Sequence, residues 1–434
     1  METGCSEAQG SPMTELGEAR LQGHVYAMRK LGAILFIVLR DRNGLTQVVV
    51  EDPSLLQAAE AISPETAIVV HGTWQRQPGR ENERELQAKQ LEILSTSKTT
   101  LPVEISRNKR MESLSLNALL EYRPLTLRNE KVRAIFKIEA ELCRAFREFL
   151  GRESFTEIHS PKIVATGTEG GASLFSVNYF GEQAYLAQSP QFYKQMMVGV
   201  FERVYEIAAV YRAEEHNTNR HLNEYVSMDF EMGFIQSEQE LIAMQTRLLK
   251  HMFSSLAENC AQELALCSAR IPQFETIAQM KLAEAVSLLQ SKLGWKSSGE
   301  DLDPEAERLL AEYMLKYENA ELLYLTHYPI EVRPFYALPE EASGKTHSFD
   351  LLFRGLEITT GGQRIHEYEQ LCASIAARGM EVAKFADYLQ CFQYGMPPHG
   401  GLAIGLERLV KQLLGLKNVR EASLFPRDRT RISP

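Results

Sequence analysis

Residues 204–235 gather charged side chains that could do chemistry. The ends of this stretch, 204–212 and 224–235, are rich in β-branched and aromatic residues, whereas the middle is crowded with charged and amide side chains. This pattern predicts a β-hairpin with a long polar loop. The loop side chains that could contact a ligand are Arg212, Glu214, Arg220 and His221. Because guanidinium binds phosphate oxygens bidentately and keeps its charge, we expect a polyphosphate ligand; the alternative is a solvated hairpin tip of mixed charge.

A glycine-rich stretch near the end of the chain supplies a matching partner for this hairpin. Residues 400–408 read GGLAIGLER and run into an amphipathic helix, with Glu407 and Arg408 near the start of that helix. Glycine permits close approach of the backbone to a ligand, and Arg408 adds a third cation for phosphate. The two segments together favour a nucleotide site over a solvated loop.

Several motifs, in the expected order along the chain, resemble those of the class II aminoacyl-tRNA synthetases. The hairpin that carries Arg212 resembles motif 2, and residues 400–408 resemble motif 3. More narrowly, RAEEHNTNRHLNE, GLEITTGGQRIHEYE and LFPRDRTRISP resemble the archaeal and eukaryotic type of aspartyl-tRNA synthetase. The resemblance covers residues 21–434. It implies a ligase that activates L-aspartate with ATP and transfers it to tRNA(Asp).

The composition is that of an ordinary globular protein. With 434 residues, of which 44% are hydrophobic and 24% charged, the chain can bury a large core and form two or more domains. It shows neither an apolar run near the ~20 residues that span a bilayer nor a signal peptide, so we expect no membrane association and a cytoplasmic location. The six cysteines form no CxxC pair, which argues against a zinc ribbon. Because the net charge is −10, a tRNA must be met by local basic patches.

The expected fold class is α+β, with four parts. Residues 1–18 read as a flexible tail. Residues 19–103 hold short β-rich runs, the last of them KQLEILSTS, with a helix-compatible interval before the fourth, which predicts a barrel of the OB type; a barrel without a ligand is the alternative. Residues 104–129 read as a hinge or connector. For residues 130–434 the resemblance implies a class II catalytic domain, an antiparallel sheet flanked by helices, with a helical insertion at about 267–340.

The resemblance implies that the barrel binds the tRNA anticodon. In the aspartate family one base stacks on a phenylalanine and is hydrogen-bonded by a glutamine and a glutamate, and the similar positions here are Phe36, Gln47 and Glu92. An aromatic face with an amide and a carboxylate can read an unpaired base. Phe36 as a core residue is the alternative.

Two departures from the family pattern concern the choice of tRNA. Members that discriminate between tRNA(Asp) and tRNA(Asn) tend to carry tryptophan where this chain has Tyr26, and a lysine in the loop where it has Pro78. A smaller ring beside a loop stiffened by proline is expected to read the last anticodon base less strictly. We therefore expect tRNA(Asn) to be a second substrate.

Residues 130–150 have the spacing of an amphipathic helix, which is followed by a strand and Pro161. This combination resembles motif 1, which builds the dimer interface of class II synthetases. The resemblance therefore implies a homodimer. The alternative is a helix that docks only on its own core.

The resemblance also assigns residues to the amino acid. The stretch TGTEGGAS resembles a loop that closes over the substrate, with Glu169 toward the ammonium group, and QSPQFYKQ resembles a segment that holds aspartate. The implied amino-acid-binding residues are Glu169, Gln191, Lys194, Arg212, Thr360 and Arg364. Lys194 and Arg364 offer two positive charges to one side-chain carboxylate, so we expect aspartate to be preferred over asparagine.

Residues 348–367 suggest a metal site. The sequence reads as a strand that ends at Glu357, followed by small residues and Arg364. A carboxylate beside a hydroxyl suits Mg²⁺, and the resemblance implies a metal on Glu357 and Thr360. The alternative is an arginine paired structurally with Glu357 or Glu367. The implied ATP-binding residues are Arg212, Ala213, Glu214, Arg220, His221, Leu222, Glu357, Gly405, Leu406, Glu407 and Arg408.

Joining a carboxylate to the α-phosphate of ATP needs alignment and charge neutralisation rather than a protein nucleophile. Arg212 is expected to bridge the α-phosphate and the amino acid's carboxylate, while Arg220 and Arg408 hold the outer phosphates. An asparaginyl-tRNA synthetase and a non-catalytic RNA-binding relative are the competing interpretations. A non-catalytic relative is expected to have lost a motif arginine or the metal carboxylate, and Arg212, Arg408 and Glu357 are all present.

Overall fold

The computed structural model describes residues 17–77, 80–168, 174–215, 218–296 and 302–433. Glu169 and Pro78 therefore lie outside the described residues. The chain divides into two compact units, Met1–Leu114 and Ser115–Pro434. Among the described residues, no helix combines the length and the apolar character needed to cross a membrane.

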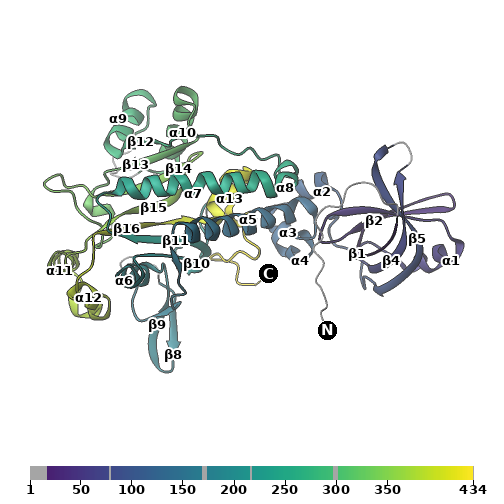
Figure 1. Ribbon diagram of the computed structural model, residues 1–434, viewed down its shortest axis with the longest axis horizontal. Coiled ribbons are helices and arrows are strands. Elements are labelled where there is room, and N and C mark those ends of the chain that lie inside the picture. Colours follow the sequence, from purple (N-terminus) through teal and green to yellow (C-terminus); the bar gives the residue numbers. More distant parts are fainter. Residues whose placement is uncertain (1–16, 78–79, 169–173, 216–217, 297–301, 434) are drawn as a thin grey trace. The chain divides into compact units, whose positions relative to one another are not determined.

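The N-terminal unit is a closed barrel with the strand order β1-β2-β3-β5-β4, which confirms the OB-type barrel (Figure 1). Its strands are β1 Glu18–Leu31, β2 Ile34–Arg40, β3 Leu45–Val50, β4 Ala67–Gln77 and β5 Arg80–Ser95. The last strand begins earlier than expected, because its polar first half pairs with β4. Helix α1 (Pro53–Ala58) and the 3₁₀ turn η1 (Ala59–Ala61) fill the predicted helical interval, and the Asp52 side chain caps α1.

The segment expected to be a connector contains short helices. These are α2 (Asn108–Glu112), α3 (Leu116–Glu121) and α4 (Arg123–Thr126). Arg123 is 99% buried and donates hydrogen bonds to the backbone oxygens of Glu421, Ser423 and Leu424 at 3.1, 2.6 and 2.9 Å. The start of the C-terminal unit is thus fastened to its own last residues.

The C-terminal unit is built on an eight-stranded sheet in the order β12-β13-β14-β15-β16-β11-β10-β6. Neighbouring strands are antiparallel except in the pairs β12–β13 and β10–β6. The strands are β6 Thr156–Glu157, β10 Arg203–Tyr211, β11 Glu224–Gly233, β12 Ala278–Lys281, β13 Leu322–Thr326, β14 Ser348–Phe353, β15 Leu356–Arg364 and β16 His399–Gly405. A small second sheet, β7-β9-β8, has the strands β7 Ile163–Val164, β8 Ser176–Tyr179 and β9 Glu182–Leu186. The predicted hairpin is the β10–β11 pair, with Tyr211 opposite Glu224.

The helices of this unit surround the sheet (Figure 1). They are α5 Glu130–Arg152, α6 Gln191–Phe201, α7 Glu238–Asn259, α8 Ala261–Leu266, α9 Leu282–Lys292, α10 Pro304–Glu318, α11 Tyr368–Ala377, α12 Ala386–Gln393 and α13 Leu406–Leu414. Short 3₁₀ turns are η2 Ile330–Val332, η3 Val382–Phe385 and η4 Val419–Ala422. Apolar side chains of α5, α7 and α13 share one core with β11, β15 and β16. This core holds the strands that carry the candidate site.

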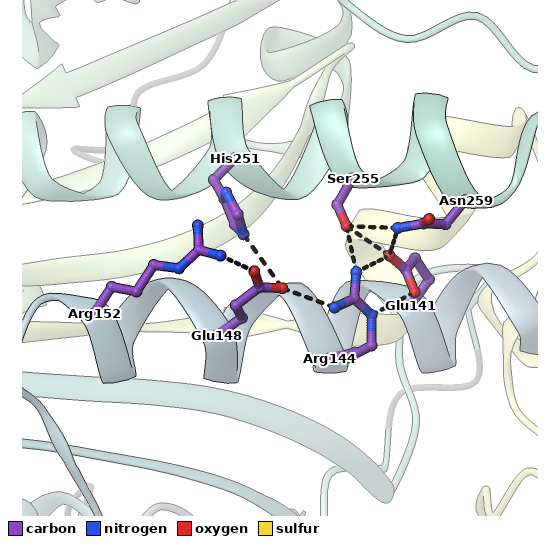
Figure 2. A network of polar contacts seen from close by, with 7 residues as sticks. All are labelled: Glu141, Arg144, Glu148, Arg152, His251, Ser255 and Asn259. Atoms are coloured by element: carbon purple, nitrogen blue, oxygen red, sulfur yellow. Dashed lines mark hydrogen bonds and ion pairs between the residues drawn. The ribbon is translucent and has the colours of Figure 1, made fainter. Parts of the chain in front are cut away.

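Helix α5 is also joined to α7 by a network of charged side chains, shown in Figure 2. Arg144 pairs with Glu141 and Glu148 on its own helix and donates to Ser255 of α7 at 2.8 Å. Asn259 of α7 donates to Glu141 at 2.8 Å. The apolar side of α5 is buried within its own unit, and these contacts tie its polar side to α7 as well.

Two local readings of the sequence differ from the structure. The expected helical insertion contains strands of the main sheet, because LLYLT at 322–326 is fully buried as β13; a short apolar run does not reveal whether it is strand or buried helix. Glu357 does not end a strand but follows the first residue of β15. The chain turns at Arg354 and Gly355, whose φ angles are +47° and +80°, a conformation that glycine adopts without cost.

Candidate active site

Two adjoining cavities lie over the β10, β11, β15 and β16 strands. The larger, of about 1010 Å³, is lined by Glu357 and by five of the predicted amino-acid-binding residues, namely Gln191, Lys194, Arg212, Thr360 and Arg364. The smaller, of about 310 Å³, is lined by Arg212, Glu214, Arg220, His221, Leu222, Glu357, Gly405, Glu407 and Arg408. They are called the large and the small cavity below. Arg212, Glu357 and Thr360 line both, so the two predicted sets of residues meet along one boundary.

Lys194 and Arg364 are held in the large cavity by buried acidic groups of β11. The ammonium Nζ of Lys194 lies 3.0 Å from Asp229 Oδ1 and 3.3 Å from Glu231 Oε2, and it donates to the Leu402 oxygen at 3.2 Å. Arg364 donates from Nε to Glu231 Oε1 at 2.8 Å. All four charged residues are at least 94% buried. Lys194 and Arg364, which line the large cavity, therefore form a balanced set of two cations and two anions with Asp229 and Glu231 behind them.

This balance corrects the expectation that two unpaired positive charges await a substrate carboxylate. Burial alone would raise the pKa of Glu231, but the charges of Arg364 and Lys194 outweigh it and hold that pKa below its usual value. Arg364 pairs with Glu231. The alternative interpretation of the sequence had paired this arginine with Glu357 or Glu367. The expected preference for aspartate therefore cannot rest on unpaired charge at Lys194 and Arg364, but it can rest on the directions of the hydrogen bonds that these two side chains offer.

The sequence carried a local signal for these acidic groups. Ser227, Asp229 and Glu231 alternate with apolar residues along β11, so a strand places all three on one face, opposite to the core. The pattern predicts a polar face, but it does not say which distant cations will meet it. Asp229 and Glu231 were consequently not predicted as site residues.

The arginines of the small cavity have carboxylate partners among the described residues. Arg220 pairs with Glu307 of α10, and Arg408 Nη1 lies 3.5 Å from Glu357 Oε1. Arg212 Nη1 is 3.9 Å from Glu214 Oε1. Burial raises the pKa of Glu307 to about 7, although Arg220 opposes this shift. Glu307 lies in the region where the sequence showed no catalytic motif.

The other predicted ATP residues fall into two groups. His221 and Leu222 line the small cavity, and His221 Nδ1 lies 2.7 Å from the Thr218 hydroxyl. Glu407 accepts hydrogen bonds from the backbone N–H of Val226 at 3.0 and 3.1 Å, so its carboxylate fastens α13 to β11. Leu406 is buried in the core and Ala213 is partly buried beside Arg212. The side chains of Leu406 and Ala213 are not part of the lining of either cavity.

Oxygen donors suitable for a divalent cation lie at the boundary of the two cavities. The Thr360 hydroxyl donates to Glu357 Oε1 at 3.0 Å. Asp350 stands opposite Thr360 in the β14–β15 pair, and its Oδ2 accepts from Arg333 at 2.7 Å. Within the described residues, Asp350 Oδ1 is buried without a hydrogen-bond partner. An orphaned carboxylate oxygen beside a second carboxylate and a hydroxyl fits Mg²⁺, which takes oxygen ligands.

Asp350 is a residue that the sequence interpretation missed. Burial raises its pKa, Arg333 lowers it, and the nearby charge of Glu357 raises it further, so the two carboxylates repel each other. The net pKa of Glu357 is lowered, because Arg408 and Arg333 outweigh its burial. A charged residue inside the apolar run SFDLLF was the available signal.

The predicted anticodon residues are spread over the outer face of the barrel. Phe36 is half-buried between the core residues Leu35 and Ile37, and its ring lies 5.4 Å from the Arg29 guanidinium. Gln47 donates to Glu85 Oε2 at 2.6 Å. Glu92 is exposed on β5. The carboxylate beside Gln47 is thus Glu85, and not the Glu92 chosen from the sequence.

Tyr26 is not displayed on the barrel surface. It is 95% buried, its hydroxyl donates to the Ile105 oxygen at 3.2 Å, and the Arg40 guanidinium lies 5.7 Å from its ring. Arg40 is in turn paired with buried Glu65 at 2.7 Å. An effect of Tyr26 on tRNA choice would therefore act through the packing of the barrel.

Two family models match the chain. The model described as tRNA synthetases class II (D, K and N) matches residues 115–429, and that described as OB-fold nucleic acid binding domain matches residues 19–94.

Individual relatives are similar over nearly the whole chain. The aspartate–tRNA(Asp/Asn) ligase of Thermus thermophilus is 50% identical over 418 residues, 96% of this chain and 97% of that protein. The aspartate–tRNA(Asp) ligase of Thermococcus kodakarensis is 41% identical over 427 residues, 96% of each. The crystal structure of asparaginyl-tRNA synthetase from Pyrococcus horikoshii with asparaginyl-adenylate superposes with a TM-score of 0.89 at 28% identity, covering 99% of this chain and 100% of that one.

Proposed function

The chain belongs to the class II tRNA synthetases of the D, K and N group, and we propose that it activates L-aspartate with ATP and transfers the aspartyl group to tRNA(Asp). The observation that carries this proposal is the pair Lys194 and Arg364, which lines the large cavity next to an arginine-lined small cavity. The names of the relatives at 41 and 50% identity support aspartate over asparagine.

The direction of hydrogen bonds gives a physical reason for this preference. Lysine and arginine only donate hydrogen bonds, and a carboxylate only accepts them. The amide of asparagine would turn its own N–H groups toward one of these cations and leave donors without an acceptor, at a cost of about 1–3 kcal/mol for each buried group. The buried acids Asp229 and Glu231 keep both cations charged and in place for that choice.

In the proposed reaction the α-carboxylate of aspartate attacks the α-phosphate of ATP and pyrophosphate leaves. Arg212 lines both cavities, so it can hold the attacking carboxylate and the α-phosphate together. Arg220 and Arg408 bind the outer phosphates after leaving Glu307 and Glu357. Asp350, Glu357 and Thr360 would hold Mg²⁺, which supplies positive charge for the phosphates.

For tRNA, we propose that the barrel binds the anticodon through Phe36 and Gln47, with Glu85 or Glu92 as the acidic partner. Charging of tRNA(Asn) is a further part of the proposal, supported by the name of the Thermus thermophilus relative. The test is aspartylation of both purified tRNAs side by side. A preference above about 10²-fold for tRNA(Asp), more than ~2.7 kcal/mol, would exclude the second substrate.

We also propose that the chain works as a homodimer, because α5 and the strand after it resemble the dimer-forming motif 1. A cytoplasmic location is a separate part of the proposal. The measurement is light scattering of the purified full chain at working concentration. A monomer that aminoacylates at the full rate would contradict this assembly.

The experiment that tests the central proposal is amino-acid-dependent pyrophosphate exchange. We expect exchange with L-aspartate and little with L-asparagine. Equal exchange with asparagine would make the asparagine assignment correct. Exchange with neither amino acid, in a folded protein that still binds tRNA, would favour a non-catalytic RNA-binding protein.

A further inference from the structure

A series of buried, hydrogen-bonded polar side chains runs behind Gln191, one of the residues that line the large cavity. Gln191 Nε2 donates to Gln195 Oε1 at 2.9 Å, and the Tyr388 hydroxyl donates to the same oxygen at 3.0 Å. Gln195 Nε2 lies 2.9 Å from His399 Nε2, and His399 Nδ1 lies 2.9 Å from the Pro397 oxygen. All four side chains are at least 96% buried. The segment QSPQFYKQ contains both glutamines, but it did not predict their contacts with Tyr388 and His399.

The Pro397 oxygen, where this series of hydrogen-bonded side chains ends, determines the direction of every hydrogen bond in the series. A backbone oxygen can only accept, so the proton of His399 is on Nδ1. In a neutral imidazole Nε2 is then an acceptor, and the Gln195 amide must turn its N–H group toward it. The Gln195 oxygen consequently faces Gln191 and Tyr388 and accepts from both.

The surroundings keep His399 neutral. Burial lowers its pKa to about 4, and although Glu231 and the Pro397 oxygen oppose this shift, Arg364 and His366 reinforce it. Tyr388 of α12 lies on the other side of the Gln195 amide. Burial raises the pKa of Tyr388 well above the usual value, so its hydroxyl keeps its proton and donates. His399 is therefore neutral throughout the physiological pH range, and the hydrogen bonds of this series keep their directions.

These contacts decide which end of the Gln191 amide faces the cavity. Its nitrogen is engaged by Gln195, so its oxygen lies on the other side of the amide group. A carbonyl oxygen accepts a hydrogen bond from an ammonium group, whereas an amide N–H group would repel it. The reversed Gln191 amide would place its oxygen against the Gln195 oxygen, so that two acceptors would face each other in a dry environment.

We propose that Gln195 and His399 are positioning residues that hold the Gln191 carbonyl oxygen toward the large cavity, so that the cavity selects an amino acid by its α-ammonium group. This inference rests on the proposed aminoacylation function. The two residues touch neither substrate nor ATP in this scheme, and they act only through Gln191.

The test compares two ligands on three variants. The ligands are aspartyl-adenylate analogues in which a sulfamoyl group replaces the phosphate, one with and one without the α-amino group. In Gln195→Leu we expect the Kd of the amino analogue to rise about 10-fold, the loss of one buried hydrogen bond, while the Kd of the deamino analogue stays within about 2-fold. In Gln195→Glu one carboxyl oxygen still accepts from Gln191 and Tyr388, and the other, held with a proton against His399 Nε2, replaces the lost N–H group, so binding of the amino analogue should be largely restored.

Gln245→Leu is the matched control. Gln245 is also fully buried, accepts from the Tyr324 hydroxyl at 2.9 Å and donates to Thr359 at 2.7 Å. It does not belong to the series of side chains behind Gln191. Any general effect of losing a buried amide should appear equally in this variant and should weaken both analogues alike.

A second measurement needs no substitution. Nitrogen-15 NMR of labelled histidines in the full chain should show His399 as the neutral Nδ1–H tautomer between about pH 6 and 8. A charged ring or an Nε2–H tautomer would overturn the inference, as would equal weakening of both analogues in Gln195→Leu. Failure of the proposed function is distinguishable, because wild-type protein would then bind neither analogue.

Discussion

The large and the small cavity hold their cations in different ways. In the large cavity the side chains of Lys194 and Arg364 are 2 and 7% exposed and share the buried carboxylates of β11. In the small cavity the side chains of Arg212, Arg220 and Arg408 are 40, 12 and 27% exposed, and their carboxylate partners among the described residues are Glu214, Glu307 and Glu357. The first arrangement is built into the fold, whereas the second can exchange its carboxylates for phosphates.

This difference separates the roles of folding and binding in the site. A preformed, balanced network keeps the amino-acid site in one geometry at the cost of desolvating four charged groups. The arginines of the small cavity avoid that cost, because their charges stay partly hydrated until a polyphosphate replaces the carboxylates. Substitutions in the two cavities should therefore have different consequences.

The largest expected effect is that of Glu231→Gln on stability. Removing this buried charge leaves Lys194 and Arg364 with Asp229 alone, and breaking a buried ion pair costs about 3–5 kcal/mol. The measurement is the free energy of unfolding of the C-terminal unit in urea. Glu153→Gln is the control, because Glu153 pairs with Arg247 at the surface at 2.6 Å and should cost about 0–1 kcal/mol. A loss below 1 kcal/mol for Glu231→Gln would show that the network is not structural.

Arg408→Ala should show the opposite pattern, a loss of rate with the fold intact. One charged contact to the transition state is worth about 2.7–4 kcal/mol, or about 10²- to 10³-fold in the rate of adenylate formation. Arg212→Ala should behave in the same way. Pyrophosphate exchange and thermal unfolding, measured on the same samples, check both halves of the expectation. Near-normal exchange in either variant would remove that arginine from the site.

The sequence predicted the elements of both cavities better than their charge balance. Runs of β-rich residues gave the β10–β11 hairpin and the barrel, and the polar loop and the glycine-rich stretch gave the three arginines as phosphate ligands. The acidic partners are a different matter, because Glu231 meets Arg364 across 133 residues of sequence and Arg220 meets Glu307 across 87. A local pattern contains no information about such pairs.

The local predictions that were wrong concern segments whose sequence pattern fits more than one structure. The run that forms β14 and β15 was read as one strand, because the Arg354–Gly355 turn interrupts it by only two residues. Asp350, the single charged residue of SFDLLF, was the remaining clue to the metal site. A buried acid in an apolar strand needs a partner, and the register of β14 against β15 shows that Thr360 is opposite it.

Asp350→Asn tests the boundary between the cavities. The amide keeps one neutral oxygen for the metal but loses the negative charge, so we expect the Mg²⁺ concentration for half-maximal exchange to rise by about 10-fold. The rate at saturating Mg²⁺ should largely recover. A deficit that is the same at every Mg²⁺ concentration would instead assign Asp350 to structural pairing with Arg333.

The smallest expected effect is that of Glu307→Gln on the KM for ATP. In the free protein the Glu307 carboxylate competes with phosphate for Arg220, and the neutral amide competes less. Because burial raises the pKa of Glu307 to about 7, the carboxyl group is only partly charged at neutral pH, so the KM for ATP should fall by about 2- to 5-fold, roughly 1 kcal/mol or less, with kcat nearly unchanged. Glu312→Gln on the same helix is the control, because Glu312 pairs with Arg308 at the surface and should leave the KM unaltered.

The pH dependence distinguishes competition by charge from a change of shape. Burial raises the pKa of Glu307 to about 7, so the carboxyl group is mostly neutral at pH 6 and mostly charged at pH 8. Competition with ATP should therefore strengthen as the pH rises through 7. The ratio of the wild-type KM for ATP to that of Glu307→Gln should be near 1 at pH 6 and reach its largest value at pH 8. A ratio that stays constant over this range would mean that the amide changes the cavity by packing, and that Arg220 is not released by titration of its partner.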